Sequence, residues 1–288
     1  MKKIIKSKIF EQLYTKEYSL GQMEKHKNRH NNHWKNHIFW AKKMVKKFWG
    51  KETGNLLDLG CSIGTYAIEF ALNGYKTIGL DLDPKALDLA RQLASEQNLE
   101  PKWICANAGD FHLPDSVDIV LCFDLLEHLD DQTIMGMFKC IKENLNPDGI
   151  FVYHTFPTEY NHIFYHNLFF KQLTSMISFP LIPFRNLNDL YFTKIVKYYS
   201  NFLDLFSMLI TGKNHKSMIR NTIHPNPLSQ ERLNKFLHNA GFDIIYSGQG
   251  IEDFNPLKDG QGSIAIKYFS NKTVAKRSLW GCAKIKEV

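Results

Sequence analysis

Residues 56–65 read Leu-Leu-Asp-Leu-Gly-Cys-Ser-Ile-Gly-Thr, an apolar run followed by a turn of small residues. The run is typical of a buried strand. Gly60 and Gly64 permit a sharp turn and the close approach of a ligand, because neither carries a Cβ. The helical pattern at 66–72 would direct its unpaired N–H groups and positive dipole end at this turn. The stretch therefore predicts a binding site for a nucleotide-like ligand.

The spacing of the glycines argues against two common nucleotide motifs. Gly60 and Gly64 have no third glycine at the offset that a nicotinamide dinucleotide motif requires, and the Gly-Lys-Ser/Thr of a P-loop is missing. Asp81 ends the next predicted strand. A carboxylate at that position can accept charge-assisted hydrogen bonds from both hydroxyls of a ribose.

In combination, these stretches resemble the class I S-adenosylmethionine-dependent methyltransferases, and among them the small-molecule, ubiquinone-pathway-like O-methyltransferases. The resemblance covers residues 52–156 and, more weakly, 226–269. Its motifs are the first motif at 57–64, the second at 79–81, the adenine loop at 107–110, the fourth strand and its sequel at 118–129, and the turn at 145–149.

The resemblance implies S-adenosylmethionine as cofactor and S-adenosylhomocysteine as product. It assigns the cofactor site to Asp58, Gly60, Ser62, Gly64, Asp81, Leu82, Asn107, Ala108 and Phe123. Asp58 would hold the ammonium group and Asp81 the ribose. Leu82 would lie on the adenine face, with Asn107 and the Ala108 N–H at its edge. Two positions depart from the family: Ser62 stands where glycine is usual, and Asn107 where aspartate is frequent.

Strand and helix patterns alternate along the chain, which predicts an α/β fold. We expect a Rossmann-like, doubly wound, mostly parallel seven-stranded sheet with an N-terminal helical cap and a helical insertion after strand 5. Strands are predicted at 55–59, 76–80, 102–105, 118–122, 149–155, 242–247 and 263–269, and helices at 22–48, 65–73, 84–97, 131–145 and 229–240. Ligands then bind outside the carboxyl ends of the strands.

The same patterns divide the chain into five regions. They are an N-terminal helical cap (1–50), a cofactor-binding core (51–156), an insertion (157–225), the return of the core with strands 6 and 7 (226–270) and a loosely held basic C-terminal tail (271–288). The insertion is rich in aromatic residues. It leaves the fifth strand where an acceptor should lie, and we interpret it as a substrate lid, although most of its aromatic side chains must form its own core.

Histidines supply the candidate acid–base groups. His128 and His154 follow the fourth and fifth strands and are the predicted catalytic residues; His33, His37, His162, His166 and His224 are assigned to substrate binding. His26, His30, His33 and His37 would share one face of the predicted helix at 22–48. That face is interpreted as a polar cover for the site mouth, with a metal stripe as the alternative.

The region after the fourth strand can also be interpreted as a metal-binding site. Asp124, Glu127 and His128 resemble in position the acidic and histidine residues of ubiquinone-pathway O-methyltransferases, in which a divalent ion is implied. The prediction made here is that no metal is bound and that Glu127 and His128 pack and orient the loop, with the metal set kept as the alternative.

Composition limits the location and the partners. The 288 residues are 44% hydrophobic and carry a net charge of +7, concentrated near the two ends, and no run is apolar enough to cross a bilayer. Five scattered cysteines fit a reduced, cytoplasmic protein. The central region shows no Lys/Arg stripe of the kind that binds nucleic acid. No protein partner is indicated, whereas contact with a membrane surface or a lipid-linked substrate remains open.

The favoured function is methyl transfer to a small molecule, with the oxygen of a metabolite, sugar or lipid-linked compound as acceptor. An RNA-modifying methyltransferase is the first alternative. A non-catalytic S-adenosylmethionine-binding protein is the second.

Overall fold

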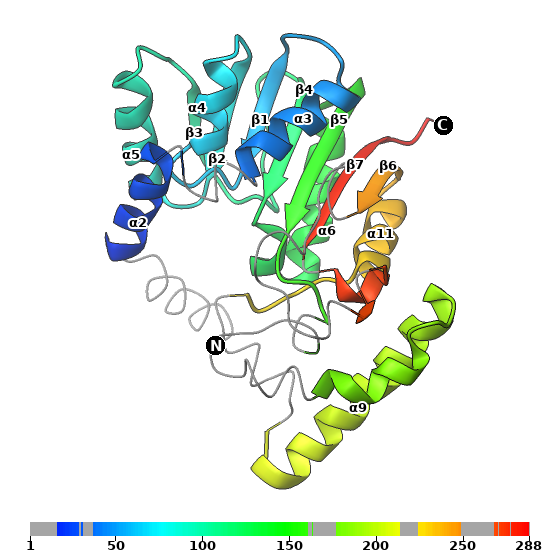
Figure 1. Cartoon of the computed structure of the whole chain (residues 1–288). Helices are drawn as coiled ribbons and strands as arrows, with labels where there is room; N and C mark the ends of the chain where they lie inside the picture. Colours follow the sequence, from blue (N-terminus) through cyan, green and yellow to red (C-terminus); the bar gives the residue numbers. More distant parts are fainter. Residues whose placement is uncertain are drawn as a thin grey trace.

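The computed structural model describes residues 16–28, 30, 37–160, 163, 177–213, 224–248, 268–269, 271–276 and 278–287. Seven strands form one sheet in the order β3-β2-β1-β4-β5-β7-β6 (Figure 1). The parallel part comprises β1 (Asn55–Leu59), β2 (Lys76–Asp81), β3 (Lys102–Cys105), β4 (Val117–Phe123) and β5 (Leu145–Thr155). β6 (Phe242–Gly248) and β7 (Leu279–Ile285) complete it, and β7 is antiparallel to both neighbours. The predicted Rossmann-like fold is confirmed.

Helices cover both faces of the sheet, as the alternation of side chains along β1 requires. Leu57 and Leu59 pack in one core with residues of α6 (Asp131–Asn144) and α11 (Gln230–Asn239). Leu56 packs in the other core with residues of α3 (Phe39–Phe48) and α4 (Thr65–Ala71). Because side chains of β1 pack into a core on each face of the sheet, the carboxyl end of this strand is held rigidly where the candidate site begins.

Caps fix the starts of the helices next to the site. Asp83 accepts a hydrogen bond from the Lys85 N–H and begins α5 (Pro84–Ser95), as its place before Pro84 predicts. Asp130 accepts from the Thr133 N–H at 2.8 Å and begins α6. Ser229 caps α11 in the same way. Each cap satisfies an N–H group that the helix itself leaves unpaired.

The last strand lies elsewhere than predicted. β7 is formed by Leu279–Ile285, in the stretch expected to be a loose tail, and it lies inside the sheet between β5 and β6. The strand predicted at 263–269 is wrong at Tyr268 and Phe269, which are helical; 263–267 lie outside the described residues. Trp280, Cys282 and Ala283 are buried, because an inner strand is covered on both faces.

The single helix predicted over 22–48 is also wrong. α2 (Lys16–Lys27) ends before Asn28, and a separate helix, α3, begins at Phe39 after a wide turn at 37–38. α3 packs through Trp40, Met44 and other apolar residues, and Lys42 reaches the buried Glu69 of α4 at 2.8 Å. His26 on α2 and His37 before α3 therefore do not share the face of one helix.

The described part of the insertion has a small core of its own. α9 (Asp189–Thr211), the 3-10 turn η3 (Phe179–Phe184) and η4 (Thr273–Ala275) contribute Leu181, Phe192, Val196 and Val274 to it. In Figure 1 this part lies below the sheet, on the side toward which the parallel strands point. The described helices include none that is long and apolar enough to cross a membrane.

Candidate active site

The turn between β1 and α4 requires its two glycines for the backbone and for packing. Gly60 and Gly64 have φ values of 76° and 77°, a region that costs L-residues with a Cβ about 1–2 kcal/mol. A Cβ on Gly64 would lie 2.3 Å from the Trp103 ring, and one on Gly60 would lie 2.8 Å from Leu125. The packing of Trp103 and Leu125 against the backbone therefore requires glycine at both positions, and a contact of Gly60 and Gly64 with the cofactor stays a prediction.

Ser62 adopts the same left-handed conformation, with φ of 49°. Its N–H donates to Oδ2 of Asp81 at 2.7 Å, while the Asp83 N–H donates to Oδ1 at 2.9 Å. Asp81 thus holds the turn as well as facing the site. Each carboxylate oxygen retains a second acceptor position, which is what two ribose hydroxyls would need. The departure from glycine at Ser62 is accommodated by backbone strain at that residue.

The region next to Asp81 presents an apolar surface and an amide. Leu82 is 54% exposed, unusual for a leucine that follows a buried strand. β3 continues the edge: its Cys105 pairs with Asp81, and the Ala106 N–H donates to the Asp81 carbonyl at 3.1 Å. Asn107 follows, exposed, with its Oδ1 accepting from the Gly109 N–H at 2.9 Å. The predicted adenine residues therefore lie at the ends of adjacent strands.

Asp58 lies inside the protein, at 2% exposure, and binds the helix that follows it. Its Oδ2 accepts from the Ala67 N–H of α4 at 3.0 Å. Burial raises the pKa of Asp58 to about 7, the Ala67 hydrogen bond partly offsets this, and the nearby Asp81 adds to the increase. A direct contact of Asp58 with an ammonium group stays a prediction.

The structure joins three elements at one carboxylate, Asp124, just after β4. His154, at the end of β5, places Nδ1 2.6 Å from Oδ1 of Asp124. His37, in the turn before α3, places Nδ1 3.4 Å from Oδ2 of the same carboxylate. The two imidazole rings meet edge to face, with centroids 4.9 Å apart. We call His37, Asp124 and His154 the inner cluster.

Electrostatics assign the protons of the inner cluster. Burial by itself would raise the pKa of Asp124, but the two histidines hold this pKa well below its usual range. Burial also lowers the pKa of His154. At neutral pH Asp124 is therefore charged and His154 neutral. A carboxylate only accepts hydrogen bonds, so Nδ1 of His154 is the donor. Trp280 of β7 packs against His154, with ring centroids 4.3 Å apart and the ring planes tilted by 42°, and restricts the orientation of the imidazole.

His37 is the more accessible of the two histidines, since its side chain is 27% exposed and that of His154 only 3%. Because Nδ1 of His37 faces Asp124 at 3.4 Å, Nε2 is the ring nitrogen that does not face the carboxylate. Asp124 has φ of 54°, a conformation that Asp and Asn tolerate better than most residues. The chain thus accepts local strain to direct this carboxylate at two histidines.

A second group lies on the other side of the same loop. Glu127 and His128 of η2 (Leu126–His128) and His224, at the end of the insertion, bring one ligand atom each within 4.8 Å of one another. Oε2 of Glu127 accepts from Thr155 at 2.8 Å, while Oε1 is buried without a hydrogen-bond partner. Burial, reinforced by His128, lowers the pKa of His224 to about 4. We call Glu127, His128 and His224 the outer cluster.

Asn226 places His224 in the outer cluster. The Asn226 backbone N–H donates to the Glu127 carbonyl at 2.9 Å, and its side-chain amide donates to the Leu129 carbonyl at 2.7 Å. Arg232 of α11 donates to Oδ1 of Asn226 at 3.0 Å. These contacts fasten the end of the insertion to η2.

The sequence-predicted histidines separate into three groups. His128, His154, His37 and His224 lie in the two clusters. His26 packs against Thr65 of α4 at 3.1 Å, away from them. His33, His162 and His166 lie outside the described residues. The sequence had coupled Asp124 to Glu127 and His128 as a metal alternative, whereas the structure turns Asp124 toward His37 and His154.

Trp280 is the site residue that sequence reasoning missed, because its strand was assigned to the tail. The predicted cofactor residue Phe123 bridges the regions: its ring lies 4.7 Å from that of Tyr66 on α4 and 5.5 Å from that of Trp280. The continuous run of uncharged residues at 279–283 was the available signal for a strand buried on both faces.

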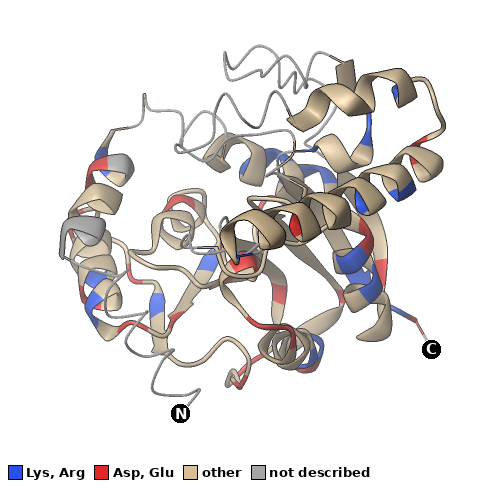
Figure 2. Cartoon of the chain, turned by 90° about the horizontal axis from the view of Figure 1, so that it is seen from below, with Lys and Arg blue, Asp and Glu red and all other residues tan. Residues whose placement is uncertain are grey.

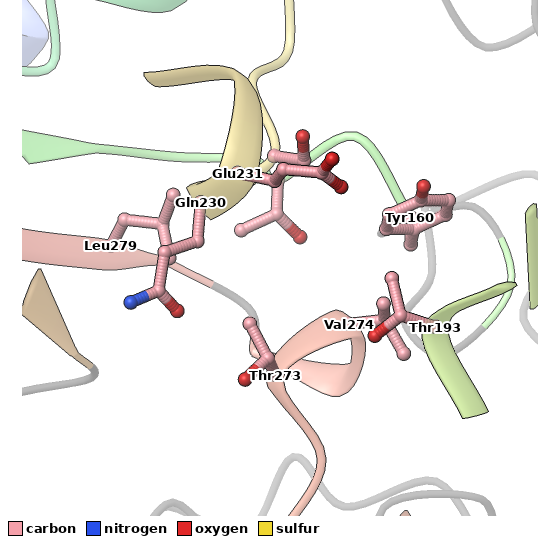
Figure 3. Close-up of a pocket in the computed structure, with 9 residues that line it drawn as sticks. Tyr160, Thr193, Gln230, Glu231, Thr273, Val274 and Leu279 are labelled. Atoms are coloured by element: carbon pink, nitrogen blue, oxygen red, sulfur yellow. The ribbon is translucent and has the colours of Figure 1, made fainter. Parts of the chain in front are cut away.

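A small cavity lies where the insertion meets the core (Figure 3). Tyr160, Thr193, Gln230, Glu231 and Thr273 line it with hydroxyl, amide and carboxylate groups, and the close-up shows them converging from η4, α9 and α11. None of the predicted site residues and no member of either cluster lines it.

The chain resembles known proteins in its central part. Residues 56–149 match the family described as "Methyltransferase domain". A ubiquinone biosynthesis O-methyltransferase from Pseudomonas fluorescens (strain Pf0-1) is 33% identical over 91 residues, covering 30% of this chain and 39% of that protein. The chain therefore aligns with about two fifths of the length of the curated relatives it matches first.

Two solved structures share the fold along most of the chain. An S-adenosylmethionine-dependent methyltransferase from Clostridium acetobutylicum matches with a TM-score of 0.55 at 11% identity, covering 95% of this chain and all of that one. The glycopeptide N-methyltransferase MtfA, complexed with S-adenosylhomocysteine, matches with a TM-score of 0.50 at 16% identity, covering 85% and 88%. At these identities the likeness concerns the fold.

Proposed function

We propose that this chain, whose central region is a class I S-adenosylmethionine-dependent methyltransferase domain, transfers a methyl group to an oxygen atom of a small molecule. The observation that carries the proposal is the joint placement of two features at the carboxyl ends of the parallel strands. One is the Ser62–Asp81 turn with the exposed Leu82 beside it. The other is the inner cluster around Asp124.

The first feature fits the cofactor. Asp81 offers acceptor positions for the two ribose hydroxyls, Leu82 offers an apolar surface for adenine, and Asn107 offers a polar edge beyond it. The buried carboxyl group of Asp58, whose pKa burial raises to about 7, is assigned to the amino-acid end, where a bound ammonium group would favour its charged form. When bound, S-adenosylmethionine supplies an electrophilic methyl carbon on a positively charged sulfur.

The second feature fits a hydroxyl acceptor. An alcohol or phenol must lose a proton as its oxygen attacks, and a positioned base accelerates this step. Nε2 of His37 takes the proton, while the charged Asp124 stabilises the imidazolium that forms through the Nδ1 side. His154 donates to Asp124 and keeps its carboxylate oriented, so His154 is a positioning residue and His37 the base. The sequence alone predicts His154 as catalytic and His37 as substrate-binding, so the proposal assigns a different role to each histidine.

The comparisons favour a small hydroxylated acceptor, since the ubiquinone biosynthesis relative is named an O-methyltransferase. The insertion with α9 lies on the acceptor side of the sheet (Figure 1), and we propose that it covers the acceptor as a lid. The cytoplasmic location stays a prediction.

The outer cluster fits a divalent cation in part. Glu127 offers a buried, unpartnered oxygen, and His128 and His224 offer imidazole nitrogens, a donor set that suits zinc and other transition metals better than magnesium. Asp124 is not part of the set, because His154 and His37 engage it. A bound cation would act as a Lewis acid that lowers the pKa of a coordinated hydroxyl.

Metal titration tests the outer cluster directly. If the set binds a cation, calorimetry with ZnCl₂ on chelator-treated protein should show one site whose affinity falls at least tenfold in Glu127→Gln, which keeps the shape but removes the charge. Asp110→Asn, an exposed carboxylate outside both clusters, serves as control. Equal affinity in wild type and Glu127→Gln would restore the metal-free prediction.

Replacement of Asp81 tests the cofactor site. Asp81→Asn is expected to raise the Kd for S-adenosylmethionine by about 10- to 100-fold, because each charge-assisted hydrogen bond contributes roughly 1.5–3 kcal/mol. Asp88→Asn, an exposed position on α5, should leave the Kd unchanged. Calorimetry measures both. Undiminished affinity in Asp81→Asn would remove the ribose role.

A labelled-methyl screen distinguishes the remaining functions. Purified protein is incubated with methyl-labelled cofactor and, separately, with metabolite, lipid and bulk RNA pools. Label in metabolites or lipids supports the proposal. Label in RNA would support an RNA-modifying methyltransferase, and cofactor binding without transfer to any pool would support a non-catalytic binding protein.

A further inference from the structure

α9 has two apolar faces, although a surface helix needs only one. Phe192, Val196 and Ser200 recur every four residues and are buried against the insertion core. On the opposite side of the helix, apolar residues follow at intervals of seven, four, three and four. These are Tyr191, Tyr198, Phe202, Leu205 and Leu209, with side chains 51–75% exposed. We call this second face the outer stripe.

The outer stripe is long and continuous. From Tyr191 to Leu209 it covers about 27 Å along the helix axis, at a rise of about 1.5 Å per residue. Met208 and Ile210, both more than half exposed, widen it near the C-terminal end. An apolar surface of this extent on a protein marks an interaction site rather than incidental exposure.

α9 carries lysines close to the outer stripe. Lys194 and Lys197 are exposed, and Lys213 follows just after the helix ends at its Gly212 cap. Of the two acidic residues of the helix, Asp189 accepts from the Thr273 N–H at 2.9 Å, and Asp204, two turns after Lys197 and on nearly the same side, is half-buried. Figure 2, a view from below, shows α9 crossing the front with blue and red segments along it.

We propose that the outer stripe of α9 docks this protein on the surface of an anionic phospholipid bilayer, with the helix lying in the interface plane. Phe202, Leu205 and Leu209 insert among the acyl chains, and the tyrosines lie at headgroup level, where an apolar ring with a polar end is favoured. Lys194 and Lys197 extend their charged ends to the lipid phosphates.

Charge distinguishes this partner from a second copy of the chain. A symmetric pairing of two outer stripes places the same residues on both sides of the contact, so lysines of the two copies would flank one interface without acidic partners on either stripe. Anionic headgroups instead neutralise them. The inference is independent of the acceptor and of catalysis, because it rests on the outer face of one helix.

Vesicle flotation of the full chain tests the proposal. Wild-type protein should float with phosphatidylcholine vesicles that contain phosphatidylglycerol and bind several-fold less to phosphatidylcholine alone. Leu205→Ser with Leu209→Ser should lower the partition coefficient about tenfold per leucine. Lys194→Gln with Lys197→Gln should lower it about fivefold per lysine on anionic vesicles only.

Matched controls distinguish docking through the outer stripe from nonspecific adsorption to vesicles. Leu72→Ser with Ile245→Ser removes two exposed apolar side chains, 44% and 46% exposed, from α4 and β6, and should bind like wild type. Cofactor affinity, measured on each variant, verifies the fold. The proposal fails if wild type ignores anionic vesicles or if the Leu205/Leu209 variant binds as well. It also fails if light scattering without lipid shows a dimer that this variant abolishes, since the stripe then serves a second copy.

Discussion

Replacing Asp124 with Asn is expected to lower kcat by about 10²- to 10⁴-fold and to change the Kd for S-adenosylmethionine by less than about twofold. Asn fits the site, because it tolerates the left-handed backbone of this position and has nearly the same shape. It cannot stabilise a positive His37, and its NH₂ group competes with the donor Nδ1–H of His154. The base then loses both its counter-charge and its orientation.

The measurement is single-turnover transfer of labelled methyl to an acceptor found in the screen. Asp130→Asn is the matched control, since it makes the same substitution at an N-cap where Asp and Asn are equivalent. The reduction in transfer rate caused by Asp124→Asn should be smaller for acceptors with a more acidic hydroxyl, because these lose their proton more readily without a base. An unchanged rate with an ordinary alcohol would show that the inner cluster is structural.

Replacing Asp58 with Asn should stabilise the protein above neutral pH and weaken cofactor binding. Burial raises the pKa of Asp58 to about 7, against about 3.9 in an unfolded chain. Between these values the folded state binds more protons than the unfolded state, so wild-type stability falls as pH rises and the loss is complete above pH 7. The cost at pH 8 is about 4 kcal/mol at most.

Asn removes this charge but brings an NH₂ group that must find a partner, at a cost of about 1–3 kcal/mol. We therefore expect the free energy of unfolding of Asp58→Asn to exceed that of wild type by about 1–3 kcal/mol at pH 8, and to lose the wild-type decline between pH 5 and 8. Urea unfolding at the two pH values measures it. Asp88→Asn is the surface control. A variant with the wild-type pH dependence would show that Asp58 does not titrate in this range.

Asp58 and Asp124 occupy similar positions in the sheet. Asp58 and Asp124 both lie at the carboxyl ends of neighbouring strands, β1 and β4, and both are held in environments that a purely structural carboxylate would avoid. The strands bury apolar residues on both faces and supply the rigidity that keeps the charges in place. Stability given up at such positions is a common accompaniment of function.

Local patterns were sufficient for most of the sheet and for the cofactor turn. The runs of apolar residues that form β1 to β5, the Asp83-Pro84 start of α5 and the small residues at 60–64 depend on neighbours within a few positions, so the sequence alone predicts them. The motif spacing likewise predicts that Asp81 and Asn107 lie at one edge, because carboxyl ends of adjacent parallel strands meet there.

Only the tertiary structure decided which groups meet across distance. β7 forms a strand because it pairs with both β5 and β6, between which it lies in the sheet. The sequence of its seven residues does not reveal this pairing. Asp124 joins His37 and His154 rather than Glu127 because a left-handed residue after β4 and the wide turn before α3 direct them together. Sequence spacing carries no information on such contacts, because they depend on side-chain direction and on packing between separate segments: His154 lies 30 positions from Asp124, and His37 lies on the far side of β1 in the sequence.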